Sequence, residues 1–485
     1  MKTKQLFKQI TIAFSLLIAS VFTANANNVV ITATTVAGSN VTFNISWENS
    51  WNTNLAPNNW DAVWVFVKYQ DCATRLWAHA GLSTIGADHT TVAPLQVDPV
   101  TDGRGVFIRR SALGGGNIAS TSVTLKMTIP AGTYNYKVFG VEMVNIPQNN
   151  FELGDGLSTS TYNSIIVNAT SQSAGISAAT LGGASATVPN TFPVGYNAVY
   201  CMKYEITQEQ YVEFLNSLTY TQQAARTVND PISAAGTYAL AAGFYYRNGI
   251  RISVPGNNSA LPAVYACDAT SGIENNSDDG QNIPVSQISW GDLAAYLDWA
   301  ALRPMTELEF EKICRGVMPR IAGEYPWGST NLTIVYNTLP GLVNDYMASE
   351  SYSPVANGMC AYGVGSGSTI YGPLRAGLFA TGSSGRESSG ATYYGVMEMG
   401  GNCYERTVVT TAGGVTYTGT LGDGTLLTSG DANAATWPSA STATGIGQRG
   451  GQWVSVASYV RTSDRSLAAT VDATRQYLNG GRGVR

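Results

Sequence analysis

A short segment near the C-terminal end of the chain carries most of the residues that could do chemistry. From Glu398 to Glu405 the sequence reads Glu-Met-Gly-Gly-Asn-Cys-Tyr-Glu. These residue types would suit an active-site loop, a metal cage or a tight turn. A Ca²⁺ ion takes about six to eight oxygen ligands, and a glycine-bent loop between two carboxylates can supply them. On the residues alone, a turn whose glutamates face water is the simpler interpretation.

Histidine-based catalysis finds little support. The sequence has two histidines, His79 and His89, both far from the segment above. A non-haem iron site needs histidines with a carboxylate partner, and Ser–His–Asp or Cys–His catalysis needs a histidine beside the nucleophile. We therefore interpret both as ordinary surface or half-buried residues.

Glutamates and arginines in the second half are expected to be structural. Glu307, Glu309 and Glu311 leave paired-carboxylate chemistry formally open, but their spacing of two points them to different helix faces. Glu307 and Glu309 also fall in the first turn of a predicted helix, where they favour the helix dipole. Several arginines are expected to be partly buried and to brace loops by pairing with carbonyls and carboxylates, namely Arg315, Arg449, Arg461, Arg465 and Arg482.

The six cysteines are widely spaced and include no Cys-x-x-Cys pair. They are Cys72, Cys201, Cys267, Cys314, Cys360 and Cys403. An oxidising compartment would permit disulfides, but the spacing does not identify partners. We expect buried thiols with one or two bridges rather than metal ligation.

Composition indicates a folded, exported protein with more than one domain. The chain has 485 residues, 44% hydrophobic and only 12% charged, about half the charged fraction of an average soluble domain. A formal net charge of −5, without a basic run, argues against nucleic acid or anionic membranes as partners.

The N-terminus resembles a secretory signal peptide. A lysine-containing start precedes an apolar run over residues 10–22, and small residues follow at Ala24 and Ala26. We expect a signal peptide over residues 1–26, cleaved near Ala26. The apolar run is too short to span a bilayer, and no other segment could insert. The predicted location is secreted or at the cell surface, or periplasmic if the protein is retained.

Residues 27–170 are predicted to form an all-β, immunoglobulin-like sandwich. Val41–Trp47 and Val123–Ile129 alternate apolar and polar residues, and Ala62–Tyr69 is a continuous apolar run typical of a buried strand. Residues 171–191, rich in Ser, Ala and Gly, are predicted to be a linker.

Residues 192–485 are predicted to form a loop-rich α+β domain with three capped helices. Each helix begins at a Ser or Thr followed three positions later by Gln, Asp or Glu. These pairs are Thr207 with Gln210, Ser289 with Asp292, and Thr306 with Glu309. Gly316 is predicted to end the third helix.

This second domain resembles the formylglycine-generating enzyme (sulfatase-modifying factor) family. The resemblance lies in motifs that occur in the family's order: YCMKYEITQEQYVEFLNSL, PVSQISWGDLAAYLDW, RPMTELEFEKICRG, YPWG, YGVMEMGGNCYERT, RGGQW and the terminal GGRGVR. It implies a C-type-lectin-related fold with little regular structure and bound calcium.

The resemblance also implies two calcium sites. In the first, Glu398 and Glu405 would supply side-chain oxygens, and Gly401 and Cys403 would supply carbonyl oxygens. Carboxylates and carbonyls are the ligands that Ca²⁺ prefers, and the register of the family motifs favours the cage over the simple turn. A second site would follow the PWG motif, at Asn337 and Thr338.

The copper site of the family's oxidases is missing its thiolates. Active members bind Cu(I) between two cysteines shortly after the RGG motif, but here Ser455 and Tyr459 stand at about those positions. Hydroxyls cannot replace thiolates around Cu(I), so copper is not expected. An oxidase would have to draw its thiolates from elsewhere, such as Cys360 and Cys403.

We therefore favour a secreted, non-catalytic binding or structural protein, with an unidentified protein or glycan as its partner. Variable proteins of diversity-generating retroelements resemble this domain and present the same C-terminal segment to partners. Tyr, Trp, Ser and Arg on a rigid backbone are typical of recognition surfaces. The expected surface comprises Trp453, Ser455, Ser458, Tyr459, Arg461, Gln476 and Tyr477. The alternative is a formylglycine-generating oxidase acting on a cysteine of an exported sulfatase-like substrate.

Overall fold

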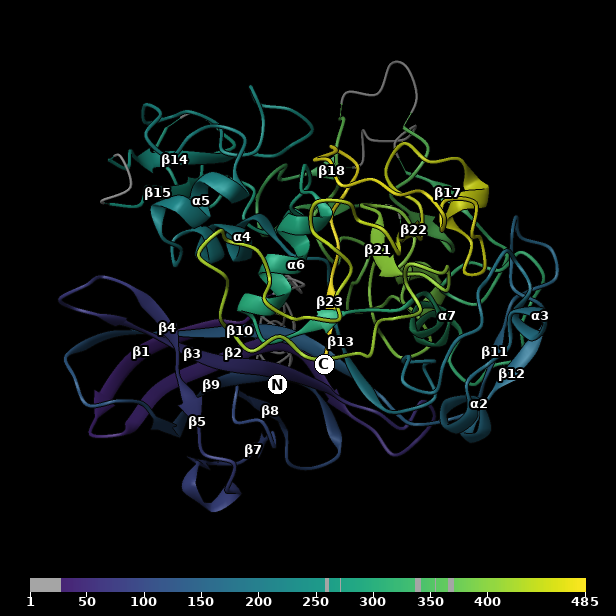
Figure 1. The fold of residues 1–485 in the computed structure, drawn as a ribbon, viewed down its shortest axis with the longest axis horizontal. Coiled ribbons are helices and arrows are strands. Elements are labelled where there is room, and N and C mark those ends of the chain that lie inside the picture. The colour runs from purple at the N-terminus through teal and green to yellow at the C-terminus, as the bar shows by residue number, and fades with distance from the viewer. Residues whose placement is uncertain (1–27, 258–260, 271, 336–341, 354, 365–369) are drawn as a thin grey trace, which may run out of the picture.

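A computed structural model describes residues 28–257, 261–270, 272–335, 342–353, 355–364 and 370–485 (Figure 1). The predicted signal peptide, residues 1–26, lies outside these residues. Among the helices described, none is long and apolar enough to cross a membrane. Strands provide most of the regular structure, in several mainly antiparallel sheets, so the predicted β-rich character is confirmed.

A five-stranded sheet forms the outer layer of the N-terminal region. Its order is β1-β2-β9-β5, and β6 also pairs with β9. In β2 the apolar residues from Val41 to Trp47 are buried and the polar residues between them are partly exposed, as the alternating sequence predicts. The strands are β1 (Val30–Ala37), β2 (Asn40–Asn52), β5 (Gly81–Leu82), β6 (Thr90–Thr91) and β9 (Gly114–Thr128).

An eight-stranded sheet packs against this layer and unites the two halves of the chain. Its order is β16-β23-β13-β10-β3-β8-β7, with β4 paired to β3. The strands are β3 (Asp61–Asp71), β4 (Trp77–His79), β7 (Leu95–Pro99), β8 (Val106–Arg110), β10 (Tyr134–Ile146), β13 (Val199–Met202), β16 (Arg303–Pro304) and β23 (Gly483–Val484). Met143 of β10 lies opposite Met202 of β13, and Cys201 lies opposite Val484. The N-terminal strands therefore form two packed sheets, but one of these sheets continues into the rest of the chain, so a separate immunoglobulin-like sandwich is not confirmed.

Strand β3 is buried on both faces and lies at the centre of the fold. Val63, Val65 and Val67 pack toward the five-stranded sheet, whereas Trp64 and Phe66 belong to the core that contains the helices. Successive side chains of a strand point to opposite faces, so a strand covered on both sides needs an unbroken apolar run. The predicted buried strand at Ala62–Tyr69 is thus confirmed, with a second covering layer that its sequence did not identify.

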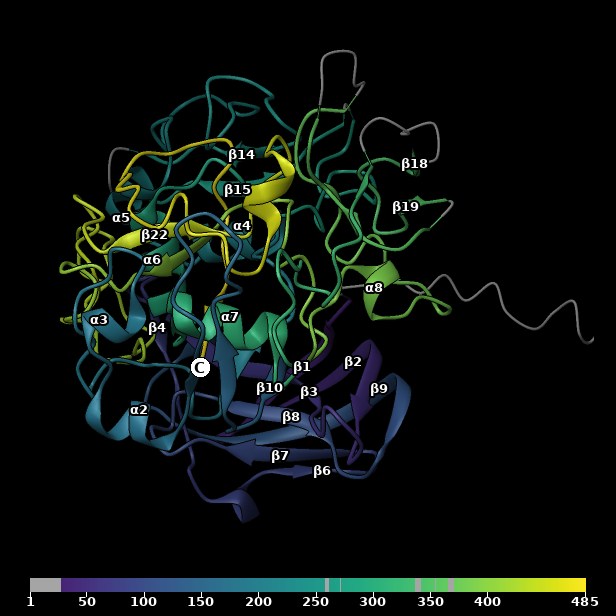
Figure 2. The same cartoon turned by 90° about the vertical axis from the view of Figure 1, so that its right-hand side faces the viewer.

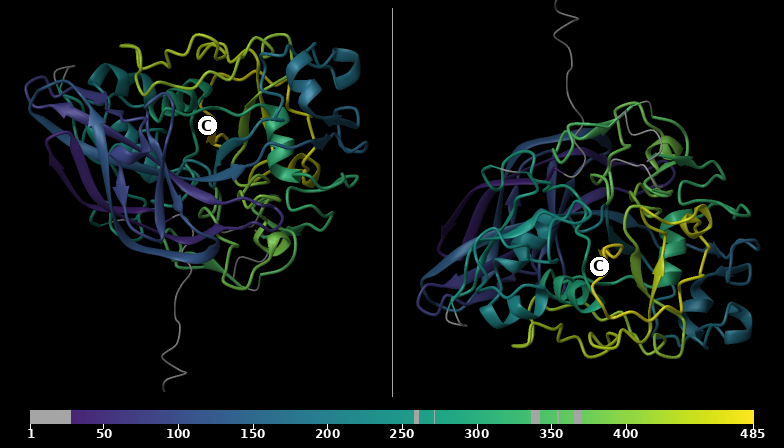
Figure 3. Two further views of the ribbon diagram at one scale, coloured as in Figure 1. Left: turned by 90° about the horizontal axis from the view of Figure 1, so that it is seen from below. Right: turned by 90° about the horizontal axis from the view of Figure 1, so that it is seen from above.

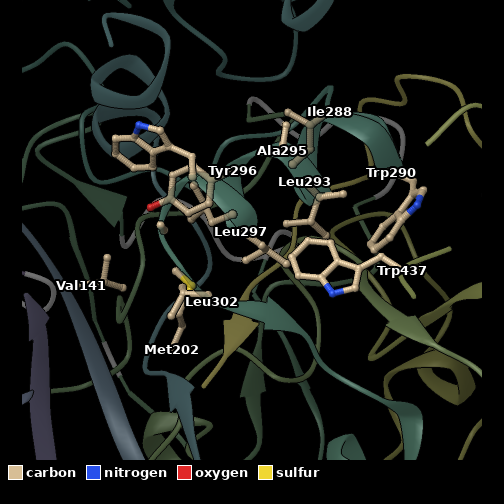
Figure 4. Packing of buried hydrophobic residues seen from close by; sticks show 14 of the residues in the cluster. Val141, Met202, Ile288, Trp290, Leu293, Ala295, Tyr296, Leu297, Leu302 and Trp437 are labelled. Atoms are coloured by element: carbon tan, nitrogen blue, oxygen red, sulfur yellow. The ribbon is translucent and has the colours of Figure 1, made fainter. Parts of the chain in front are cut away.

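The three predicted helices are confirmed at their predicted caps. They are α4 (Gln208–Leu215), α6 (Trp290–Trp299) and α7 (Glu307–Arg315), each opened by a capping box at the Ser or Thr named above. The last helix ends at Gly316, whose φ is 67°. Helices α4 and α6 cover the second face of the large sheet (Figures 1 and 2). Figure 4 shows Leu293, Tyr296 and Leu297 of α6 in the core with Val141 and Met202 of the sheet.

The segment predicted as a linker is folded instead. Residues 171–191 contain the end of α2 (Ala169–Ala174) and all of α3 (Ala178–Leu181), both opened by side-chain caps. Leu181 and Val188 are fully buried in the main core. Small polar residues are typical of linkers, but Asn168 and Ser177 here act as N-caps, which local composition did not reveal.

Short elements and long loops complete the C-terminal half, which lies opposite the N-terminal strands in Figure 3. The helical turns of this half are α5 (Tyr220–Arg226), α8 (Arg386–Ser389) and η3 (Ala457–Val460), whereas η1 (Gly86–Asp88) lies among the N-terminal strands. Two-stranded sheets join β11 (Phe151–Leu153) with β12 (Ile165–Val167), β14 (Ile250–Val254) with β15 (Val264–Cys267), β17 (Thr333–Ile334) with β20 (Met359–Cys360), β18 (Leu342–Val343) with β19 (Ser351–Tyr352), and β21 (Glu405–Val408) with β22 (Ile446–Arg449).

Candidate functional site

Glu205, which follows β13, holds the loop from Glu398 to Glu405 by hydrogen bonds. One oxygen of Glu205 accepts a hydrogen bond from the Cys403 amide at 2.8 Å, and the other accepts from Asn402 Nδ2 at 2.8 Å. Asn402 also bonds the backbone of Leu374 through both its amide nitrogen and oxygen. Sequence reasoning did not select Glu205 or Asn402, although both lie within motifs that carry the family resemblance.

Arg482, which precedes β23, ties both ends of the loop together. Its guanidinium donates to Glu405 Oε1 and to the Glu398 carbonyl oxygen. It also donates to the carbonyls of Met202 and Lys203 at 3.3 and 3.2 Å. The prediction that Arg482 braces loops is confirmed, and one buried cation here contacts three separate segments.

Three buried carboxyl groups, those of Glu205, Glu398 and Glu405, lie around Arg482. Burial raises the pKa of Glu398 to about 7 against the opposing effect of Arg482. Burial also raises the pKa of Glu205 well above its ordinary value, with a further contribution from the Glu405 carboxylate. Oε2 of Glu398 and Oε2 of Glu405 are buried without a hydrogen-bond partner among the described residues. Buried carboxylate oxygens normally have a partner, so two such oxygens in one loop fit a bound cation.

The predicted ligands of the first calcium site therefore lie in one loop. Glu398 and Glu405 contribute the two unpartnered oxygens, and Gly401 and Cys403 lie between them in the same turn. Within the described part of the chain, no group of three or more His, Cys, Asp and Glu side chains is arranged to hold a metal, so backbone carbonyls would have to complete the set. Asn337 and Thr338, predicted for the second site, lie outside the described residues.

Gly401 is required by the shape of this loop. Its φ is 80°, and a Cβ there would lie 2.5 Å from Cys360 Sγ and 2.6 Å from the Ala361 oxygen. Both contacts are shorter than van der Waals distance, and the left-handed backbone disfavours any side chain. The glycine in the sequence motif is thus explained by close packing against β20 and its following residue.

Replacing Gly401 by alanine should destabilise the protein by ~1–3 kcal/mol. The new methyl group would collide with Cys360 Sγ and the Ala361 oxygen, and the backbone at this position has a left-handed conformation. Urea unfolding monitored by circular dichroism would measure the change. Gly382→Ala is the matched control, since a Cβ at Gly382 meets nothing within 4 Å. Equal stabilities of the two variants would contradict the packing argument.

Glu307 of α7 is the centre of a buried ion-pair network. It accepts hydrogen bonds from Arg465 Nε at 2.7 Å, from Arg449 Nη1 at 3.1 Å and from the Thr410 amide at 2.7 Å. Burial alone would raise the pKa of Glu307, but the Arg465 and Arg449 guanidinium groups outweigh it and lower the pKa to about 2. This carboxylate is therefore ionised and fully occupied by structural partners.

The other two glutamates of α7 are paired in the same way. Glu309 forms a bidentate salt bridge with Arg303, with hydrogen bonds of 2.6 and 2.9 Å. Glu311 accepts from Arg449 at 2.9 Å and from Arg315 at 3.2 Å. Because each carboxylate is held by at least one guanidinium, none has the free lone pairs of an acid–base pair.

The two histidines are bound to neighbouring backbone and side chains within the N-terminal half. His79 Nε2 lies 2.6 Å from the Arg104 oxygen, and its Nδ1 lies 3.3 Å from Lys68 Nζ. His89 bonds the Ser83 oxygen at 2.8 Å and the Lys126 amide at 3.2 Å. Burial and the Lys68 ammonium lower the pKa of His79 well below its ordinary value. Both rings thus serve the packing of β-strands and turns.

All six cysteines have free thiols, so the expected one or two disulfides are not formed. Cys72 is exposed and the other five are buried. Burial raises the pKa of Cys201 to about 12 and raises those of Cys360 and Cys403 well above the ordinary thiol value. Thiolates are the copper ligands and the nucleophiles, and these environments favour the neutral thiol.

The positions where the family's copper cysteines were expected carry hydroxyl groups. Ser455 is 3% exposed, and its Oγ accepts a hydrogen bond from the Gln452 amide at 2.9 Å. It also lies 3.5 Å from the Tyr404 hydroxyl. Tyr459 is partly exposed on η3, where its amide bonds the Val456 oxygen.

Of the seven residues predicted to form the recognition surface, two are buried and five are at least partly exposed. Trp453 is only 1% exposed, and its ring packs 5.3 Å from that of Tyr246. Together with Ser455, Trp453 is therefore a core residue and not a displayed side chain, because neighbouring loops cover it. The remaining predicted residues reach the surface in whole or in part, namely Ser458, Tyr459, Arg461, Gln476 and Tyr477.

Sequence reasoning missed an aromatic loop beside this surface. The Tyr246 ring stacks on Tyr477 with centroids 4.3 Å apart, and Tyr371 lies 6.4 Å from Trp453. Tyr245 and Tyr371 are 51% and 44% exposed. We call the group Tyr245, Tyr246, Tyr371, Trp453 and Tyr477 the aromatic face. The run Phe-Tyr-Tyr at 244–246 was the available signal.

A family model for the sulfatase-modifying factor enzyme 1-like domain matches residues 141–477. This match spans more than half of the chain, and the chain belongs to that family. The matched stretch begins within β10, which pairs with β13 in the eight-stranded sheet.

Individual relatives match shorter stretches. The formylglycine-generating enzyme of Thermomonospora curvata is 39% identical over 70 residues, 14% of this chain and 22% of that protein. Those of Bos taurus and Mus musculus are each 26% identical over 145 residues, 28% of this chain and 35% of theirs. The matched part thus spans about a third or less of these relatives. A solved structure, Treponema denticola variable protein 1, is similar with a TM-score of 0.31 and 14% identity, over 71% of this chain and 95% of that one.

Proposed function

We propose that this protein is an exported, non-catalytic binding protein that displays a recognition surface on a calcium-braced, C-type-lectin-related domain. The observation that carries the proposal is that Ser455 and Tyr459 stand where an oxidase of this family needs two copper thiolates. Hydroxyl groups do not hold Cu(I). We therefore propose that the domain has a binding function, which its exposed aromatic residues support.

The aromatic face supports a binding role. Tyr245 and Tyr371 are about half exposed, the Tyr246 and Tyr477 rings stack on each other, and the Trp453 ring lies tilted against both. Stacked rings lose little conformational freedom on binding, and exposed Tyr side chains offer both an apolar surface and a hydroxyl group. Gln476, which is exposed, adds hydrogen-bonding capacity at the edge of the face. The partner we propose is a secreted or cell-surface protein or glycan.

Calcium is proposed as the brace of the loop from Glu398 to Glu405. The unpartnered Oε2 atoms of Glu398 and Glu405 would bind the ion, and the carbonyls of Gly401 and Cys403 would complete its coordination. Bound Ca²⁺ would neutralise charge that Arg482 leaves uncompensated. Its role in this proposal is structural.

A binding screen tests the recognition role. Full-length mature protein is applied to arrays of glycans and of secreted proteins, and any binder is titrated by calorimetry. Tyr245→Ala and Gln476→Ala should each weaken that binding at least 10-fold, because both side chains lie on the exposed side of the face. Ile85→Ala, at a residue 61% exposed in the N-terminal region, is the matched control. Affinity unchanged in all three variants would contradict this surface.

An oxidation assay tests the alternative. Protein supplied with Cu(I) and oxygen should not convert the cysteine of a sulfatase-like peptide to formylglycine, because the two expected thiolate positions carry hydroxyl groups. Mass spectrometry of the peptide would detect the loss of sulfur. Turnover that disappears in Cys360→Ser or Cys403→Ser would establish the oxidase instead.

A further inference from the structure

A cavity lies between the N-terminal strands and the C-terminal half, separate from the aromatic face. It has a volume of about 400 Å³ and is bounded by the loop over residues 49–59 and the segment over residues 380–397. None of its lining residues belongs to the aromatic face or to the predicted recognition surface. Its size falls within the range of small-ligand sites in proteins.

The cavity walls are fixed by contacts between the two halves. Asn59 Nδ2 donates to the Tyr394 oxygen at 2.9 Å and to the Asn145 oxygen at 3.1 Å, and its Oδ1 accepts from Trp51 Nε1 at 3.1 Å. The Trp51 ring also packs on Gly395, where a Cβ would lie 3.1 Å from the ring. The indole is therefore held in place by its own hydrogen bond and by backbone.

Aromatic rings and short hydroxyl side chains line the cavity together. Trp51 and Tyr393 are partly exposed, and Tyr204 and Tyr394 form buried parts of the wall. Thr381 and Ser384 contribute hydroxyl groups at the side of the C-terminal segment. Flat rings offer faces for the apolar side of a ligand, and the hydroxyls can bond polar groups at its edge.

The charged side chains that line the cavity are all positive. The lining includes Lys203 and Arg386 and no carboxylate. Lys203 is already balanced, since its Nζ bonds Glu142 Oε2 at 2.9 Å in a buried pair. Arg386 forms no salt bridge among the described residues; its guanidinium lies over the Tyr393 ring, 5.6 Å from the ring centroid, and its Nε is buried without a hydrogen bond. Nη2 of Arg386 donates to the carbonyls of Cys314 and Pro326, so the guanidinium is oriented but not neutralised.

We propose that this cavity binds an acidic saccharide, such as a unit containing a hexuronic acid. The sugar ring would lie against the partly exposed Trp51 ring, its hydroxyls would bond Thr381 and Ser384, and its carboxylate would pair with Arg386 beside Tyr393. A ligand with an apolar ring face, many hydroxyls and one negative charge matches all three features of the lining. A charge-assisted bond to the unbalanced guanidinium would set the preference for the acidic over the neutral sugar.

Calorimetric titration of the full chain tests this assignment with two matched probes. One is the disaccharide of glucuronic acid and N-acetylglucosamine, and the other is the neutral N,N′-diacetylchitobiose. We expect the acidic probe to bind at least 10-fold more tightly. Arg386→Gln should abolish that preference, and Arg386→Lys, which keeps the charge, should retain most of it. Trp51→Ala should weaken both probes at least 10-fold.

Thermal unfolding of each variant checks that it is folded, and Ile85→Ala, at an exposed residue outside the cavity lining, should leave both affinities unchanged. If Trp51→Ala does not fold, the Arg386→Gln and Arg386→Lys pair still decides the question. Equal affinity for the two probes, or no heat with either at 10-fold molar excess and ~1 mM protein, would overturn the proposal. Tighter binding of a proline-rich peptide than of either sugar would overturn it in favour of a peptide groove.

Discussion

Replacing Glu307 by glutamine is expected to lower the free energy of unfolding by about 3 kcal/mol at pH 7. Two buried guanidinium groups, those of Arg449 and Arg465, would lose their shared carboxylate while keeping their positions. Removing one partner of a buried pair typically costs about 3–5 kcal/mol. The pKa of Glu307 near 2, against an ordinary value of 4.5, implies a similar magnitude. Urea unfolding of both proteins would measure the difference.

The pH dependence of this difference distinguishes charge from packing. A carboxylate whose pKa is lowered in the folded state contributes stability that is fully present above its unfolded pKa and is lost as pH falls toward the folded pKa. The deficit of Glu307→Gln should therefore be largest above pH 5 and shrink between pH 4.5 and 2. Glu152→Gln, in the exposed pair with Arg320, is the matched control and should change stability by less than ~1 kcal/mol. A deficit that is constant with pH would contradict an ionic origin.

Removal of calcium is expected to lower the melting temperature by several degrees. At a Ca²⁺ concentration of about 100 times the dissociation constant, binding stabilises the folded state by about 2.7 kcal/mol, and EDTA removes this contribution. The physical reason is that Glu205, Glu398 and Glu405 are three buried carboxyl groups whose pKa values burial raises in spite of Arg482, and a bound cation would favour their ionised form. Differential scanning calorimetry with 1 mM Ca²⁺ and with excess EDTA would measure the shift.

A matched variant identifies the loop as the source of that shift. Glu398→Gln removes one charge and one of the two unpartnered oxygens but leaves the Glu405–Arg482 pair intact. It should reduce the Ca²⁺-dependent shift by more than half. Asp345→Asn, at a carboxylate paired with Arg247 outside the loop, should leave the shift unchanged. Equal melting temperatures of the wild type in Ca²⁺ and in EDTA would rule out the calcium brace.

Local features of the fold could be predicted where local interactions decide them. The three helices begin at Thr207, Ser289 and Thr306 because each of these side chains accepts a bond from its own first turn. The strand from Val41 to Trp47 alternates because one of its faces meets the core. The helix α5 was missed, although it has the same type of cap at Thr219 with Gln222.

Features that depend on distant segments could not be predicted. The partners of Glu405 and Glu307 are Arg482 and Arg465, which lie 77 and 158 positions away along the chain. The burial of Trp453 depends on Tyr246, from a loop that sequence reasoning left undescribed. Spacing along the chain carries no information on which of several arginines meets which glutamate.

The sequence by itself determined the family, the capped helices, and the alternating and buried strands. Each of these depends on residue types at short spacing, where the chain's own geometry fixes the outcome. Only the tertiary structure decided that the N-terminal strands join the sheet of the C-terminal half, that five thiols are buried, and which glutamate oxygens are left unpartnered. Burial and unsatisfied charge arise when remote segments meet, and they are properties of packing that no single stretch of residues contains.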